Sequence, residues 1–333
     1  TVFQFAITIG IMIALFNNFG LHQWALAMSE TAREGSFMKH FLVDETWRAM
    51  FGSELIPGLV YLVLAFMLPE SPRWLIKAGK HERAKKVLNR IFRNGADQEF
   101  ETIRETVAEE SANEKRFVDV FHKRYRKPLI IAMLLAAFAQ VIGINVVFYY
   151  GTSMLEGAGF KSDSALSGMA IIGFFNMIFT VVAMKYVDKL GRRLLLQIGT
   201  IGAIACLVGI GTTFGSGASN MLIVLMCAFV AFFAFSLGPI KFIFASEIFP
   251  TNIRSHAMSI AILTMWLTDT IVGQFTPALR EGVGPTGTFL IFAAILVPQI
   301  FMVWKVMPET AGRSLEEIER TYYGQERPDR EPQ

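Results

Sequence analysis

The sequence is poor in charge and in cysteine, and both shortages exclude classes of protein. Charged residues make up 18% of the 333 residues, against 53% hydrophobic residues, which is the composition of a polytopic membrane protein rather than of a soluble domain. The two cysteines, Cys206 and Cys227, lie inside apolar runs, so they indicate neither a disulfide framework nor a metal site. The formal net charge is only +3, and no basic, aromatic-interleaved patch points to nucleic acid.

Signatures of covalent chemistry are also missing. The sequence has no phosphate-cradling glycine loop, no paired His/Cys ligands and no recognisable Ser–His–Asp arrangement. We therefore expect neither an enzyme nor an ATP-driven pump, and no cofactor or metal. The chain starts at Thr1 and enters a hydrophobic segment within three residues, without the positive flank of a signal peptide. This start is the one expected of a fragment of a longer protein.

Long apolar runs are what the sequence has in abundance. Runs of about 18 to 25 mostly apolar residues, each long enough to cross a bilayer, predict eight transmembrane helices. They are placed at residues 4–20, 50–68, 127–150, 165–187, 194–214, 221–248, 257–279 and 288–306. Lysine and arginine gather after the second span, after the fourth and in the tail. The positive-inside rule therefore places both ends of the chain in the cytoplasm.

A polar insert, residues 69–126, separates the second and third predicted spans. Its apolar residues, such as Trp74, Leu88 and Ile91, recur near helical spacing between lysines and arginines, which predicts several short amphipathic helices at the cytoplasmic face. Such helices either bind the membrane interface or link two helix bundles. Two predicted spans precede the insert and six follow it, so a six-plus-six protein would contain four more.

Polar side chains inside three of the predicted spans need partners. Gln140 and Asn145 lie near or just past the middle of residues 127–150, where amides either face a substrate path or join helices without a ligand. Lys241 and Asp269 also lie within spans, where a lone charge costs roughly 2.5–3.5 kcal/mol. They either pair with each other, or one contacts a charged substrate, or Lys241 snorkels to the cytoplasmic surface.

Four short motifs carry a family resemblance. Residues 69–75 read PESPRWL, residues 188–193 DKLGRR, residues 246–250 SEIFP and residues 308–310 PET. In this order and spacing they resemble the sugar porter family of the major facilitator superfamily. The resemblance implies an all-α membrane protein of the major facilitator fold, a fragment with about eight of twelve transmembrane helices and a cytoplasmic helical insert. Its expected parts are the last two spans of the N-terminal bundle (1–68), a cytoplasmic helical linker domain (69–126), a six-span C-terminal bundle (127–307) and a cytoplasmic tail (308–333).

The resemblance also implies which residues meet the substrate. Those matching the family's sugar-contacting positions are Gln4, Gln140, Asn145, Tyr149, Asn176, Trp266 and, where an Asn is common, Asp269. Amides suit a neutral polyol because each donates and accepts hydrogen bonds at once. Four departures from the family pattern, Ala139, Ala234, Phe242 and Met265, replace polar or larger side chains. They predict a less polar cavity with one extra carboxylate.

A second set of residues is expected to gate the cytoplasmic side. Arg–carboxylate pairs there would clamp the two halves when this side is closed, whereas the alternative is charge that only sets topology. The clamp residues are Glu70, Arg73, Asp188, Arg192, Arg193, Glu247, Arg254 and Glu309. Gly143 and the Gly238–Pro239 pair, which should break the span at 221–248, are the expected hinges.

The function implied by the resemblance is proton-coupled movement of a monosaccharide or related polyol by alternating access. Alternatives are an uncoupled sugar facilitator, an organic acid or inositol carrier of the same fold, and a non-transporting sugar sensor, against which the short tail counts. The expected location is the inner (plasma) membrane. Expected partners are the substrate, protons and the lipid bilayer, with no nucleic acid and no obligate protein partner.

Overall fold

The computed structural model describes residues 2–31, 33–92, 95–112, 116–214, 219–313 and 317–318, and every regular element in these ranges is helical. The all-α prediction is therefore confirmed for this part of the chain. The elements are α1 (Val2–Ser29), η1 (Lys39–Asp44), α2 (Thr46–Ser53), α3 (Leu55–Met67), α4 (Pro72–Lys77), α5 (His81–Ile91), α6 (Ala96–Ala112), η2 (Phe117–Phe121), α7 (Lys123–Val141), α8 (Ile144–Gly157), α9 (Ser162–Leu190), α10 (Arg192–Thr213), α11 (Ser219–Phe235), α12 (Leu237–Ile248) and α13 (Thr251–Lys305).

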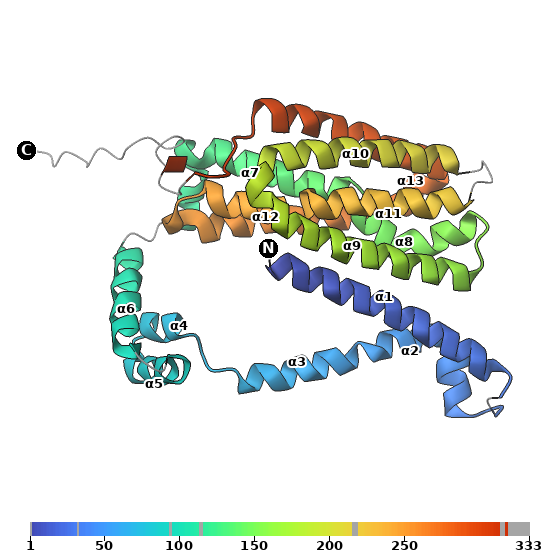
Figure 1. Ribbon diagram of the computed structural model, residues 1–333, viewed down its shortest axis with the longest axis horizontal. Coiled ribbons are helices and arrows are strands. Elements are labelled where there is room, and N and C mark those ends of the chain that lie inside the picture. The colour runs from blue at the N-terminus through green and yellow to red at the C-terminus, as the bar shows by residue number, and fades with distance from the viewer. Residues whose placement is uncertain are drawn as a thin grey trace, which may run out of the picture.

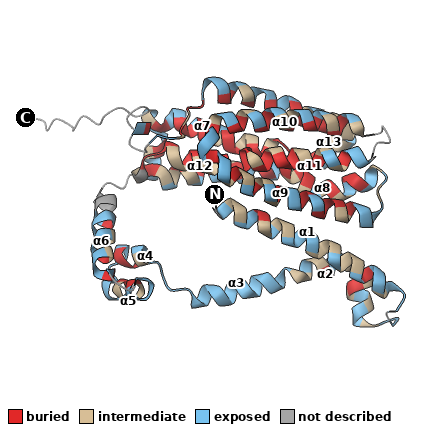
Figure 2. Cartoon of the chain, in the orientation of Figure 1, coloured by how far each residue is buried: buried red, intermediate tan, exposed pale blue. Residues whose placement is uncertain are grey.

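Helices α7 to α13 form one bundle, and α1 lies against α9 on its side (Figure 1). These helices are apolar on most faces, as expected of segments that meet either lipid or other helices. The bundle core contains fully buried side chains such as Leu135, Val147, Phe229 and Phe244. Figure 2 shows this buried interior, whereas α3 has no buried residue.

Helix α13 contains two of the eight predicted spans. Its 55 residues would measure about 80 Å as a straight helix, against a hydrocarbon core about 30 Å thick. Gly284 interrupts the helix with φ 72° and ψ 170°, and Thr310 Oγ1 donates to Glu247 Oε2 at 2.6 Å. The chain therefore returns to the end at which α13 begins. The described residues contain seven helices long and apolar enough to cross a membrane, and the last supplies two crossings.

Two spans are broken in the middle. Between α7 and α8, Gly143 has a φ of +83°, which glycine adopts without steric cost. Between α11 and α12, the break is at Ser236, with φ −125° and ψ −88°. The break thus precedes Gly238 and Pro239 rather than falling on them. The reason is that Pro239 fits the first turn of α12, where an N–H is not needed, but its ring would clash with the carbonyl of Phe235 in a continuous helix.

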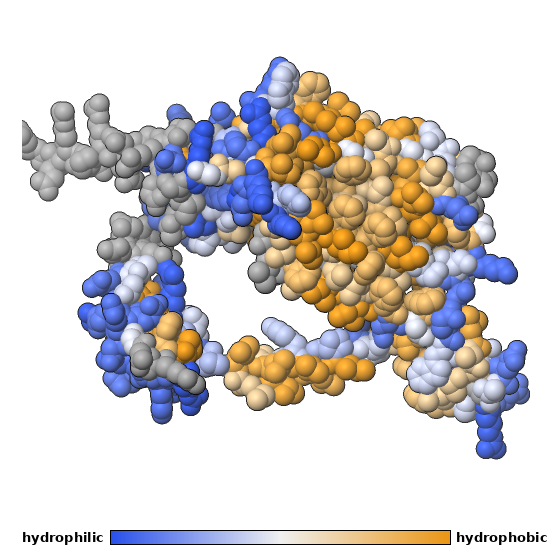
Figure 3. Space-filling model, viewed as in Figure 1, coloured by the Kyte–Doolittle hydropathy of each residue, from blue (hydrophilic) through white to orange (hydrophobic). Residues whose placement is uncertain are grey.

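The insert folds around a small core of its own. Helices α4, α5 and α6 bury Leu75, Ala84, Leu88 and Phe100 against one another, so the amphipathic pattern serves helix packing. Ile91, which the sequence pattern places among the apolar residues of this insert, is instead 60% exposed. The outer surface of this unit is hydrophilic, in contrast with the apolar surfaces of the bundle and of α3 (Figure 3).

Close packing of α10 generates the first prediction. A Cβ on Gly199 would overlap the side chain of Ser236 and lie 3.0 Å from the carbonyl oxygen of Phe232, and such small residues let helices approach closely in membranes. We expect Gly199→Ala to lower the melting temperature of the detergent-purified protein, because overpacking costs about 1–3 kcal/mol. Size-exclusion analysis after heating measures the change.

The matched control is Gly282→Ala on α13, where an added Cβ meets no atom within 4 Å. The control is expected to leave the melting temperature unchanged or slightly higher, since Ala is the better helix former. Equal melting temperatures for the two variants would contradict the packing role of Gly199.

Candidate functional site

Two amides, a phenol and a carboxylate meet between α7, α8 and α13. Asn145 Nδ2 donates to Gln140 Oε1 at 3.0 Å and to Asp269 Oδ1 at 2.6 Å. Tyr149 OH donates to Asp269 Oδ2 at 3.2 Å. The structure thus brings together four of the seven residues expected to contact substrate. We call these four residues the amide–carboxylate cluster.

The broken helix gives the cluster its geometry. Gln140 lies on the last turn of α7 and Asn145 on the first turn of α8, so the left-handed Gly143 between them lets the two side chains meet. Tyr149 follows Asn145 by four residues and shares its helix face. One turn beyond Asp269, the carbonyl of Gly273 accepts a hydrogen bond from Tyr150 OH at 3.1 Å. Helix α8 is therefore joined to α13 over more than one turn.

The cluster is buried on one side and open on the other. Gln140 is 4% and Asp269 7% exposed, whereas Tyr149 is 58% exposed. Asp269 accepts hydrogen bonds from two uncharged donors, Asn145 and Tyr149, so its polar contacts here leave its charge uncompensated. A set of donors and acceptors with one open side can exchange its internal hydrogen bonds for those of a ligand.

The other three expected residues lie on α1, α9 and α13 and do not join the cluster. Gln4 on α1 approaches α12, because its Nε2 would lie 3.8 Å from a Cβ on Gly238. Asn176 is 3% exposed on α9, and Trp266 is 55% exposed on α13. Among the described residues, none of the three side chains makes a hydrogen bond to the cluster.

Lys241 is held by aromatic rings. Its Nζ lies 5.1 Å from the ring centroid of Phe242 and 5.5 Å from that of Phe233, within cation–π range. In the described part of the chain it makes no ion pair, so the direct contact with Asp269 that the sequence left open is not formed. Phe242 also packs edge-on against Phe3 of α1, with centroids 5.9 Å apart.

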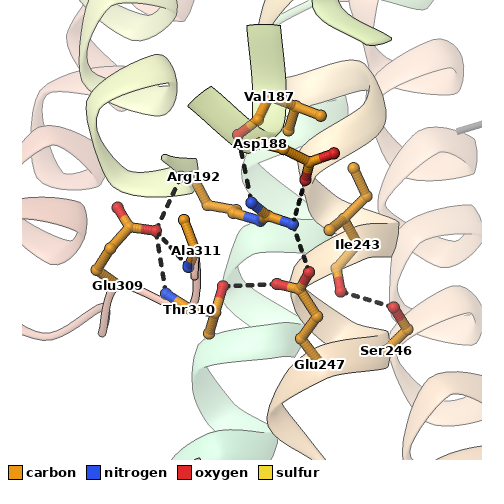
Figure 4. Close-up of polar contacts among 9 residues, drawn as sticks. All are labelled: Val187, Asp188, Arg192, Ile243, Ser246, Glu247, Glu309, Thr310 and Ala311. Atoms are coloured by element: carbon orange, nitrogen blue, oxygen red, sulfur yellow. Dashed lines mark hydrogen bonds and ion pairs between the residues drawn. The ribbon is translucent and has the colours of Figure 1, made fainter. Parts of the chain in front are cut away.

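At the end of the bundle where α10 begins, Arg192 connects three helices (Figure 4). Its Nη2 donates to Asp188 Oδ1 at 2.8 Å and to Glu247 Oε1 at 2.6 Å, and the other Glu247 oxygen accepts from Thr310 Oγ1 at 2.6 Å. Arg192 and Glu247 side chains are only 8% and 21% exposed. The guanidinium thus ties the ends of α9, α10 and α12 together, and Thr310 adds the segment after α13.

Glu309 binds backbone rather than a basic side chain. It accepts hydrogen bonds from the N–H groups of Arg192 and Arg193 at the start of α10, both at 2.9 Å, and from those of Thr310 and Ala311, both at 3.0 Å. A carboxylate is stabilised at a helix N-terminus by the exposed N–H groups and the helix dipole. Burial raises the pKa of Glu309, but the four N–H donors outweigh burial and hold the pKa below its ordinary value.

Gly191 makes this contact possible. Its φ is +81°, and a Cβ there would lie 2.8 Å from Glu309 Oε2. Thr310 and Gly191 were not singled out from the sequence, although both lie inside motifs that carry the family resemblance. Of the remaining expected clamp residues, Arg254 Nε donates to the carbonyl of Phe249 at 3.1 Å, and Glu70 and Arg73 are exposed residues of the insert. The contacts of Arg192, Glu247, Glu309 and Thr310 join helices within one bundle.

Comparison with known proteins gives a consistent family. The family model described as "Sugar (and other) transporter" matches residues 1–322. The arabinose-proton symporter of Bacillus subtilis is 38% identical over 285 residues, which cover 84% of this chain and 61% of the relative. The glucose transport protein of a Synechocystis species is 34% identical, with 95% and 68% covered. The D-xylose-proton symporter of Escherichia coli K12 is also 34% identical, with 95% and 63% covered.

Solved structures agree with the sequence relatives. The inward open conformation of the xylose transporter XylE from E. coli matches with a TM-score of 0.75 and 31% identity, over 96% of this chain and 64% of that chain. XylE bound to 6-bromo-6-deoxy-D-glucose matches with a TM-score of 0.71 and 31% identity, over 96% and 66%. The chain spans about two thirds of the length of these proteins. It belongs to the sugar porter family of the major facilitator superfamily.

Proposed function

We propose that the protein containing this chain moves a monosaccharide or related polyol across the membrane by alternating access. The observation that carries the proposal is the amide–carboxylate cluster of Gln140, Asn145, Tyr149 and Asp269 at the break of a membrane-spanning helix. Discontinuous helices build the midplane sites of many secondary transporters. The relatives named above as sugar transporters support the same class of substrate.

The chemistry of the cluster suits hydroxyl groups. Asn145 Nδ2 donates to both Gln140 and Asp269. A hydroxyl group can accept a hydrogen bond from Asn145 while it donates one to Asp269. A sugar can therefore take over these bonds one for one, so that no polar group is left buried without a partner. Gln4, Asn176 and Trp266 complete the proposed site from neighbouring helices, with the Trp266 ring available to the C–H face of the sugar.

The cytoplasmic network is proposed to stabilise one state of the transport cycle. Arg192, Glu247, Glu309 and Thr310 hold α10, α12 and the segment after α13 together. An arrangement of charge-assisted bonds at the end of a bundle is a two-state element that opening can break. Gly143 and the Ser236 break, next to Gly238 and Pro239, are the positions where the helices would bend.

The family and the charge pattern support a proposal for coupling and for placement in the membrane. Proton coupling is proposed because two of the named relatives are proton symporters, and uncoupled facilitation is the alternative. The basic insert and the basic turn at Arg192 and Arg193 support a plasma membrane orientation with both ends of this chain in the cytoplasm. The insert would then link the two bundles on that side.

The substrate role of the cluster predicts the effect of removing one amide. In the full-length protein, expressed in cells without sugar transporters of their own, Gln140→Ala should reduce saturable uptake of a radiolabelled sugar roughly tenfold to a hundredfold. Losing a hydrogen-bond partner in a buried polar site costs about 1–3 kcal/mol. Adding a protonophore to the same assay distinguishes coupling, since symport collapses and facilitation continues.

The matched control is Asn220→Ala, which removes an exposed amide at the start of α11. It should leave uptake unchanged when the amount of protein at the membrane is equal. Normal sugar uptake by Gln140→Ala would contradict the proposed site. Uptake of carboxylates but of no sugar would show that the protein transports a different class of substrate.

The network predicts a loss of stability when its central pair is broken. Glu247→Gln leaves the guanidinium of Arg192, 8% exposed, with Asp188 as its remaining carboxylate partner, and losing a hydrogen bond to a charged group costs about 1.5–3 kcal/mol. The melting temperature in detergent should fall. The control Glu281→Gln, an exposed carboxylate on α13, should leave it unchanged; an equal fall in both variants would rule out a special role for Glu247.

The lowered pKa of Glu309 predicts how the stability of the protein changes with pH. Its pKa is lowered in the folded protein, so its contribution to stability is present above the ordinary Glu pKa of about 4.3 and is lost as the pH falls through the lowered value. The difference in melting temperature between wild type and Glu309→Gln should be full at neutral pH and should shrink below pH about 4. A difference that grew on acidification would contradict this assignment.

A further inference from the structure

Lys241 forms no ion pair with any described residue, although it lies inside a membrane-spanning segment. It lies within the span Asn220–Ile248, and its described contacts are the ring faces of Phe233 and Phe242. Among the described residues, no acceptor binds its three N–H groups. Charged residues at this depth normally pair or face a water-filled path, so the open donor positions point to an acceptor supplied by something other than these side chains.

Lys241 lies near the amide–carboxylate cluster, in a cleft that no residue of the cluster itself lines. Lys241 lines a small, otherwise apolar cleft together with Ala136 of α7 and Met265 of α13. Ala136 precedes Gln140 by four residues, and Met265 precedes Asp269 by four. In a helix this spacing is one turn, about 5.4 Å, on the same face. Lys241 therefore lies about one turn from the cluster, towards the cytoplasmic end.

The formal charges of Lys241 and Asp269 are equal and opposite. Asp269 is 7% exposed and accepts from neutral donors, Asn145 and Tyr149. The two groups do not touch, but they carry opposite formal charges across a gap of about one helix turn. In a medium of low dielectric constant an attraction of this kind persists over such a gap. The result is a site with a donor end and an acceptor end and no net charge.

We propose that Lys241 is a substrate contact that, with Asp269, makes the site select neutral polyols. The ammonium donates to one hydroxyl group and the Asp269 carboxylate accepts from another, so an uncharged sugar bridges the two. A sugar acid or an amino sugar brings a net charge into a site that is already balanced. This inference rests on the proposed transport function and deepens it by naming the charge class of the substrate.

Competition for uptake in the full-length protein tests the charge balance. Uptake of a labelled neutral hexose is inhibited at pH 7.4 by the unlabelled hexose, its hexuronate or its 2-amino derivative, and the ratios of inhibition constants are compared within each variant. In wild type the neutral sugar should inhibit at least tenfold better than either charged one. Because only ratios within one variant are used, differences in expression or folding yield cancel.

Substitutions should move the ratios in opposite directions. Asp269→Asn leaves a net positive site and should improve inhibition by the hexuronate, relative to the hexose, about tenfold. Lys241→Met leaves a net negative site and should improve inhibition by the amino sugar, relative to the hexose, about tenfold. The double variant should restore the neutral preference. Lys305→Met, which removes a lysine placed 5.6 Å from the Trp304 ring, is the matched control and should keep the wild-type ratios.

Variants too slow for uptake are assayed by ligand-induced thermal stabilisation of the purified protein, with the same three sugars. Unchanged ratios in both single variants would overturn the proposal, and so would a wild type that prefers the hexuronate to the hexose, while transport itself would stand. A wild type that neither takes up nor binds any sugar would overturn the proposed function and this inference with it.

Discussion

The hydrocarbon core of a membrane leaves no water to satisfy a polar group, and this constraint shapes most of the structure. Every backbone N–H and C=O must be bonded within the protein, so the apolar runs are helical. A break in such a helix is tolerated where neighbouring helices shield it. The breaks at Gly143 and Ser236 face the packed interior, because a Cβ on Gly143 would overlap the Phe292 ring and Ser236 is fully buried. The same constraint makes Gln140, Asn145 and Asp269 partners of one another.

Carboxylates stabilise the bundle in three different ways. Glu247 pairs with a guanidinium, Glu309 with the backbone N–H groups of a helix start, and Asp269 with an amide and a phenol. The first two lie at the end of the bundle where α10 begins, where charge is easily accommodated. The third lies inside the bundle, where neutral donors do not cancel its charge. This difference sets Asp269 apart as the residue whose environment calls for a function beyond packing.

The fold was predictable from the sequence because hydrophobic runs and the four motifs act locally. The helical class and the family are confirmed, and the folding back of α13 accounts for eight predicted spans in seven long helices. The sequence places the helix break at Gly238 and Pro239, whereas the structure places it at Ser236. The motif marks the proline, but the helix breaks next to the carbonyl of Phe235, with which the proline ring would clash. The meeting of Asn145 with Asp269 depends on how α8 and α13 are rotated, which spacing along one helix does not give. The sequence left open whether Lys241 pairs with Asp269 for the same reason, because pairing depends on how α12 and α13 are rotated.

The attachment of Glu309 to the start of α10 bears on how the protein can be engineered. Ala311 supplies one of the four N–H groups that bind this carboxylate, and Thr310 supplies another together with the hydroxyl that reaches Glu247. A purification tag or fluorescent fusion joined directly after the last membrane span would remove these donors. The shortest safe fusion point is therefore beyond Ala311, and a cleavage site for tag removal belongs on the far side of it as well.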